Sequence, residues 1–162
     1  GCRIFKNYVI MDLMNYPLNL KMFKVIHFAM IMGVVMLTVL FSVIGFSNFS
    51  FGKVLLEENL ISQEGISVLI MALTVVAFVV SIIVKKKIEK ANMEGVLTKI
   101  SYQNYFIIRL GAFELVLMMS LMLCSGFDDY VFWFCYIANM LGMLFLAKPD
   151  AELIEGLEQE WE

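Results

Sequence analysis

An arginine and a glutamate lie inside an otherwise apolar stretch of this sequence, Tyr105–Cys124 (YFIIRLGAFELVLMMSLMLC). An ionisable side chain at the centre of a membrane costs about 2.5–3.5 kcal/mol on insertion scales, so it marks a place where chemistry or assembly occurs. If the stretch is a helix that enters the membrane at Tyr105, Arg109 lies only about 6 Å deep. Its long side chain then reaches the headgroups. We therefore interpret Arg109 as an interfacial cation.

Glu114 lies near the middle of the same stretch, where its short side chain cannot reach water. It must be protonated, hydrogen-bonded or exposed to a wet cavity. Arg109 points about 140° away around the helix, so it is a poor partner. Asn139 is the best candidate, because its amide can donate a hydrogen bond to a carboxylate. Together with two hydroxyl residues expected at similar depth, these residues form a predicted mid-membrane polar network: Glu114, Asn139, Thr74 and Thr38.

Two hypotheses about Glu114 remain open at this point. In the first, Glu114 is a structural staple whose hydrogen bond fixes helix packing or assembly. Glu114→Gln would then preserve the fold, and Glu114→Leu would weaken the bundle by about 1–2 kcal/mol. In the second, Glu114 is a protonatable group on a transport path. Such a path usually has further polar groups, broken helices or an internal repeat, and the sequence indicates none of these, which favours the staple.

The rest of the chain consists of apolar stretches that must position these residues in a membrane. Of its 162 residues, 61% are hydrophobic and 17% are charged, and the charges are clustered. This pattern is typical of a polytopic membrane protein rather than a soluble domain. A helix needs about 20 residues to cross a hydrocarbon core of about 30 Å. Four stretches are close to that length, and the predicted spans are 25–46, 66–84, 105–124 and 130–147.

The predicted fold is an all-α integral membrane protein. Its transmembrane domain, 25–147, is an antiparallel bundle of four transmembrane helices, because the links within each hairpin are short. A cytosolic leader, 1–24, precedes the bundle, and a short cytosolic amphipathic C-terminal helix, 148–162, follows it. Met11 and Met14 in the leader are candidate initiator residues, and we expect no cleavable signal peptide.

Small residues predict where the third and fourth helices pack closely. Gly111 lies on the Glu114 face of the third helix, and Ala138 and Gly142 form a small-xxx-small pair beside Asn139. We expect these two helices to pack tightly around a contact between Glu114 and Asn139.

Lysine and arginine predict the orientation of the bundle. The outer loop 47–65 carries Lys53 as its one cation, and the second outer loop, 125–129, carries none. By the positive-inside rule the cation-rich side, with both termini, faces the cytosol. Its cations are Arg3, Lys6, Lys21, Lys24, Lys85, Lys86, Lys87, Lys90, Lys99 and Lys148. Four of these, in the partly amphipathic inner loop 85–104, are predicted to contact anionic lipid headgroups rather than nucleic acid: Lys85, Lys86, Lys87 and Lys90.

The C-terminal segment is predicted to be an acidic amphipathic helix. It begins at Pro149, which suits a first helical turn, and acids follow. Its apolar residues recur at helical spacing: Leu153, Ile154, Leu157 and Trp161. The helix either folds back on the basic inner loop, which the opposite charges favour, or docks on a partner.

Residue types that support catalysis or metal binding are sparse. Cys2, Cys124 and Cys135 form no metal-ligand spacing, and we interpret the latter two as buried small residues. His27 is interpreted as a helix-packing or interfacial histidine. We expect no metal, no cofactor and no enzymatic activity.

Three segments carry a family resemblance: LNLKMFKVIHFAMIMGVV, LTKISYQNYFIIRLGAFE and KPDAELIEGLEQEW. They resemble a family of small uncharacterised four-span inner-membrane proteins of Bacteroidota-type bacteria. In that family a Tyr-Gln-x-x-x-Ile-Ile-Arg segment ending in glutamate introduces the third span, which corresponds here to Gln103, Arg109 and Glu114. Lys148 stands where the family is expected to have arginine. The resemblance implies four spans in a bacterial cytoplasmic (inner) membrane and brings no known activity.

The expected function is therefore that of a non-enzymatic membrane protein. We expect it to sit in the lipid bilayer as an accessory or assembly subunit of a membrane complex, or as a homo-oligomer. The alternative is a small proton-coupled transporter or channel-like protein that uses Glu114.

Overall fold

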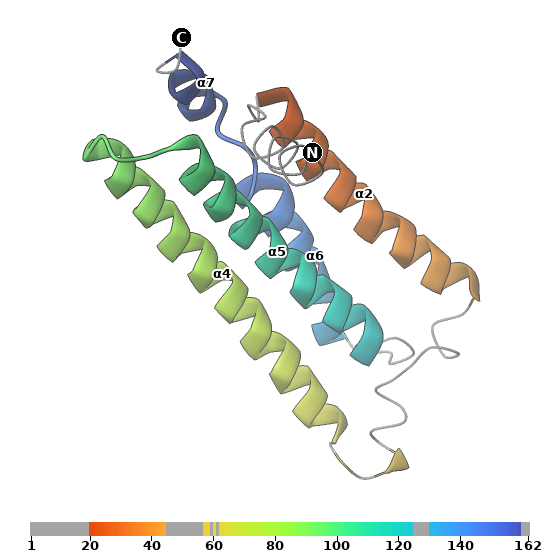
Figure 1. The fold of residues 1–162 in the computed structure, drawn as a ribbon. Coiled ribbons are helices and arrows are strands. Elements are labelled where there is room, and N and C mark those ends of the chain that lie inside the picture. Colours follow the sequence, from red (N-terminus) through yellow and green to blue (C-terminus); the bar gives the residue numbers. More distant parts are fainter. Residues whose placement is uncertain (1–19, 45–56, 59, 61, 125–129, 160–162) are drawn as a thin grey trace, which may run out of the picture.

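The computed structural model describes residues 20–44, 57–58, 60, 62–124 and 130–159, and their regular structure is helical throughout (Figure 1). The all-α class predicted from the sequence is confirmed for these residues. The predicted second outer loop, most of the leader and of the first outer loop, and Trp161 lie outside them. The elements are α2 (Leu20–Ile44), α4 (Gln63–Met93), α5 (Lys99–Cys124), α6 (Tyr130–Leu141), the π-helix η2 (Gly142–Leu146) and α7 (Ala151–Gln159).

Three helices, α2, α4 and α5, are long and apolar enough to cross a membrane. This agrees with the first three predicted spans and indicates a membrane protein. The predicted fourth span is different, because α6 has only 12 residues and continues as η2 to Leu146. This helical stretch is long and apolar enough to cross a membrane only if α7 is counted with it, and α7 is bent from it by 41°.

The buried stripe of α4 explains how this helix packs. Its buried residues recur every three or four positions, which is the spacing that one face of a helix requires, and the helix contacts α5 and α6. Ser62 caps the start of α4, where its hydroxyl accepts a hydrogen bond from the Gly65 N–H at 3.1 Å. The buried residues are Ile66, Ile70, Thr74, Ala77, Ser81, Val84 and Ile88.

The end of α4 differs from the prediction. The helix runs nine residues past the predicted limit at Val84, through the lysine cluster, to Met93. Exposed ion pairs one turn apart, Lys85–Glu89 and Lys90–Glu94, both at 3.9 Å, fit this continuation. The predicted inner loop is thereby reduced to residues 94–98, where Gly95 has a left-handed φ of 70°.

The helices lie side by side with their charged ends together (Figure 1). The starts of α2 and α5, the end of α4 and the whole of α7 are at one end of the molecule. All described lysines belong to these segments or to the link that precedes α7. The residues Leu20–Lys24, predicted as part of the leader, form the first turn of α2.

The π-helix η2 brings the chain close to α5. Its wide turn is closed by the Ala147 N–H, which donates to the Gly142 carbonyl at 3.0 Å. A Cβ atom on Gly142 would lie 2.5 Å from Cε1 of Phe113, so any larger residue would require the Phe113 ring to move. The close approach predicted at Gly142 is confirmed. The one predicted at Gly111 is wrong, because a Cβ atom there meets nothing within 4 Å.

The helix α7 closes the charged end of the bundle. It begins two residues after Pro149, and Asp150 caps it by accepting a hydrogen bond from the Leu153 N–H at 3.3 Å. Ile154 and Leu157 are buried, and α7 contacts α2 and α5. The link and α7 form a cleft with the end of α4 and the first half of α5.

Candidate functional site

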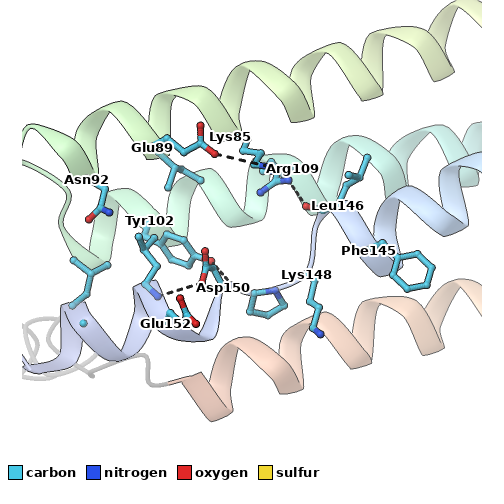
Figure 2. A pocket seen from close by; sticks show the side chains of 15 residues that line it. Lys85, Glu89, Asn92, Tyr102, Arg109, Phe145, Leu146, Lys148, Asp150 and Glu152 are labelled. Atoms are coloured by element: carbon cyan, nitrogen blue, oxygen red, sulfur yellow. Dashed lines mark hydrogen bonds and ion pairs between the residues drawn. The ribbon is translucent and has the colours of Figure 1, made fainter.

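Arg109 joins three elements near the charged end of the bundle (Figure 2). Its Nε donates to the Ser81 hydroxyl on α4 at 3.2 Å, and its Nη2 donates to the Leu146 carbonyl at the end of η2. Ser81 is almost fully buried. The guanidinium is therefore held by groups of the bundle itself, whereas the sequence suggested only lipid headgroups as its partners.

These contacts satisfy carbonyl groups that the end of η2 leaves without a backbone partner. The last carbonyls of any helix lack intrahelical N–H donors, and in hydrocarbon each must find one within the protein. Arg109 donates a hydrogen bond to the Leu146 carbonyl. His27, from α2, donates from Nε2 to the Met143 carbonyl at 2.7 Å. The interpretation of His27 as a helix-packing residue is thereby confirmed.

A cleft of about 760 Å³ lies between α4, α5, the end of η2 and α7 (Figure 2). Tyr102 stands in it, and its hydroxyl accepts a hydrogen bond from the Asp150 N–H at 3.0 Å. Apolar residues such as Ile88, Phe145 and Leu153 form part of its wall. The charged lining residues are Lys85, Glu89, Arg109, Lys148, Asp150 and Glu152.

Two of these charged side chains are available for a ligand. Lys148 and Glu152 make no ion pair or side-chain hydrogen bond with another described residue. Lys85 is only weakly engaged, since its ion pair with Glu89 is long and exposed. An apolar wall beside free charges of both signs is chemically suited to an amphiphile with a charged head.

A second polar cluster joins α4 to α6 in the middle of the bundle. The amide nitrogen of Asn139 donates to the Thr74 hydroxyl at 3.0 Å and to the Cys135 carbonyl at 2.8 Å. The Thr74 hydroxyl donates in turn to the Ile70 carbonyl at 2.9 Å. Asn139 and Thr74 are both buried. Cys135 is buried and free, as predicted.

Thr38 pairs with a residue that the sequence analysis did not single out. Its hydroxyl donates to the Val34 carbonyl at 2.8 Å and is also hydrogen-bonded to the Tyr136 hydroxyl. Since the one proton of Thr38 goes to Val34, Tyr136 is the donor. This contact joins α2 to α6, next to the Asn139 cluster along the chain.

Glu114 stands apart from both clusters. It is half-buried, and it has no hydrogen bond or ion pair with any described residue. The predicted Glu114–Asn139 bond is not formed: both amide protons of Asn139 are donated elsewhere, and its buried Oδ1 has no hydrogen-bond partner among the described residues. The predicted network is therefore divided into Thr74–Asn139, Thr38–Tyr136 and an isolated Glu114.

The sequence held signals for two of the missed residues. Ser81 is the one hydroxyl residue in the apolar run AFVVSIIV that precedes the lysines, at the depth expected for Arg109. Tyr136 lies one helical turn before Asn139 and therefore on the same face. The role of Tyr102 depends on how α7 docks, which no local pattern encodes.

No family model, curated protein or solved structure matches this chain at a significant level. Its function must therefore be inferred from the cleft, the two paired clusters and Glu114.

Proposed function

We propose that this chain is a four-span protein of a bacterial cytoplasmic membrane and serves as a non-enzymatic accessory or assembly subunit of a membrane complex. In this proposal α2, α4 and α5 are three spans, and α6 with η2 is the fourth, in an antiparallel bundle. The grouping of the described lysines at one end supports a cytosolic location for that end and for both termini.

The isolation of Glu114 is the observation that carries the subunit role. A carboxylate in the middle of a membrane helix needs a partner, and none of the described residues supplies one. The hydroxyl groups of Thr38 and Thr74 and the amide nitrogen of Asn139 are hydrogen-bonded within the chain. Glu114 is also only half-buried, so its flank of α5 is open to a neighbour. A hydrogen-bond donor on a helix of another subunit would satisfy it.

The sparse packing of α2 supports an external partner as well. Only 6% of the most apolar stretch of α2 is buried inside the molecule, compared with 28% for α4 and 39% for α5. Large apolar residues are exposed along it, including Phe28, Met36 and Val43. Lipid or a second protein covers this surface in a membrane.

Site-specific photo-crosslinking in native membranes tests the subunit role. A photoreactive residue replaces Met118, one turn after Glu114 on the same flank of α5. A matched probe replaces Val75, an exposed residue of α4. We expect a discrete protein adduct from position 118, either with a second copy or with another protein, and lipid adducts from position 75. If both positions give only lipid adducts, the proposal fails.

Proton-coupled transport is the alternative function, and Glu114 would be its carrier. It requires water to reach Glu114 from one side of the membrane, and the cleft described above is not lined by Glu114. In proteoliposomes that contain a pH-sensitive dye, we expect no proton flux that Glu114→Gln abolishes. A flux lost in that variant would replace the subunit role with transport.

A further inference from the structure

The charges of the cleft are ordered along the membrane normal. On α4, Lys85 lies one turn deeper in the bundle than Glu89, and on α5 Arg109 lies two turns deeper than Tyr102. Asp150 and Glu152 come from the segment that closes the charged end of the bundle. Figure 2 shows Arg109, Phe145 and Leu146 toward one end of the cleft, with Asp150 and Glu152 toward the other. Cations therefore lie on the membrane side and acids on the aqueous side.

The wall of the cleft continues into the apolar surface. Phe145 and Leu146 line the cleft beside Arg109, yet they are 71% and 40% exposed. A ligand whose charged head lies against Arg109 therefore has an apolar surface beside it for hydrocarbon chains. This is the arrangement that a phospholipid requires, with a phosphate next to its acyl chains.

The balance of charges selects among phospholipids. The cleft has three cations, Lys85, Arg109 and Lys148. It also has three acids, listed in chain order as Glu89, Asp150 and Glu152. A headgroup with negative charge alone would place its outer part beside these acids, which is unfavourable. A zwitterionic headgroup complements both ends, because its phosphate lies deeper than its ammonium group.

We propose that this cleft binds the headgroup of a phospholipid of the ethanolamine type. The phosphate lies at the membrane end, against Lys85 and the remaining N–H donors of Arg109. The primary ammonium lies at the aqueous end of the cleft, against the free carboxylate of Glu152. A primary ammonium has three N–H donors for such contacts, whereas the trimethylammonium of choline has none. This proposal rests on membrane insertion of α4 and α5, and it does not depend on the subunit role of Glu114.

Native mass spectrometry of the full-length protein in detergent tests the proposal. Phosphatidylethanolamine, phosphatidylcholine and phosphatidylglycerol with identical acyl chains are titrated separately, and their dissociation constants are compared. We expect phosphatidylethanolamine to bind most tightly, by about three- to fivefold, which is the size of an exposed charge contact. Equal binding of the ethanolamine and choline lipids, or tighter binding of phosphatidylglycerol, would overturn the assignment.

Two variants test the ends of the cleft separately. Glu152→Gln should remove the preference for ethanolamine over choline while leaving the affinity for phosphatidylcholine unchanged. Glu155→Gln, an exposed acid of the same helix outside the cleft, should behave as the wild type. Lys85→Gln should weaken all three lipids, with Lys87→Gln, outside the cleft, as its control. Arg109 is left intact because it also holds η2. An ethanolamine preference that survives Glu152→Gln would contradict the proposed orientation.

Discussion

Thr74 and Asn139 illustrate how two buried polar side chains join apolar helices. The Thr74 hydroxyl gives its proton to the Ile70 carbonyl of its own helix, so its oxygen is free to accept from α6. Asn139 in turn donates its second amide proton to the Cys135 carbonyl. Each residue thus makes one bond within its helix and shares one bond between α4 and α6, which fixes the rotation of each helix relative to the other.

A double-mutant cycle between these two residues measures the interhelical bond. We expect Thr74→Val and Asn139→Leu to be coupled by about 0.6–1.7 kcal/mol, the range found for hydrogen bonds between membrane helices. The measurement is the free energy of unfolding in mixed micelles. The control is Ser120→Ala, because Ser120 is buried but bonds only to the Val116 carbonyl of its own helix. Coupling between Ser120 and Asn139 as large as that between Thr74 and Asn139 would show that the bond is not specific.

The sequence was sufficient to identify polar residues at mid-depth but not to pair them. Thr38, Thr74 and Asn139 stood out because a polar residue in an apolar stretch is rare and requires an explanation. Partner choice depends on how each helix is rotated and which neighbours it has, and depth alone does not determine either. For that reason depth alone predicts Glu114 as the partner of Asn139, whereas Asn139 donates to Thr74 in the structure.

At the scale of elements, the change from α-helix to π-helix at Gly142 positions the candidate site. The π-helix ends where Arg109 and His27 supply donors to its carbonyls, and Gly142 allows the ring of Phe113 to approach its backbone. The start of η2 is therefore packed against α5, and its end is held by hydrogen bonds from α5 and α2.

Gly142→Ala tests this packing. The new methyl group would lie 2.5 Å from Cε1 of Phe113, so we expect a loss of stability of about 1–3 kcal/mol, as in other overpacked cores. Gly111→Ala is the matched control, since its methyl group meets nothing within 4 Å. Because alanine favours a helix over glycine by about 0.5–1 kcal/mol, the control should be neutral or stabilising. Thermal unfolding in detergent compares the two, and equal stability would argue against the close contact.

Element boundaries were only partly predictable. Hydropathy identified the apolar parts of α2, α4 and α5, because the hydrocarbon thickness sets a minimum length. It could not locate the end of α4, since a helix continues past the last apolar residue wherever its charged residues also favour helix. It also gave no sign of η2, because a π-helix depends on tertiary contacts such as that between Gly142 and Phe113.

At the scale of the whole molecule, the proposed topology predicts which residues are accessible from each side. In a variant without native cysteines, single cysteines are placed at Lys86 and Glu155 on the charged end and at Glu58 before α4. We expect an impermeant thiol reagent to label only position 58 in intact spheroplasts. Positions 86 and 155 should become labelled after the membrane is opened. Labelling of all three positions in intact spheroplasts would contradict the orientation that the lysines indicate.

The whole molecule also accounts for the contrast between Glu114 and the other polar groups. The Thr38, Thr74 and Arg109 side chains each tie one helix of the chain to another. Glu114 has no such contact with the described residues. A staple formed within this chain is therefore unsupported, and a staple between subunits is the form of the hypothesis that the geometry favours.

The most direct test of that claim is purification of the wild type, Glu114→Gln and Glu114→Leu from native membranes in mild detergent. Mass spectrometry identifies the proteins that accompany each variant, and thermal unfolding of each variant in isolation is the control. We predict a stoichiometric companion, or a second copy, with the wild type and Glu114→Gln, because an amide still forms the hydrogen bond. With Glu114→Leu the companion should be lost while the isolated chain stays as stable as the wild type. Retention of the companion by Glu114→Leu would contradict the account.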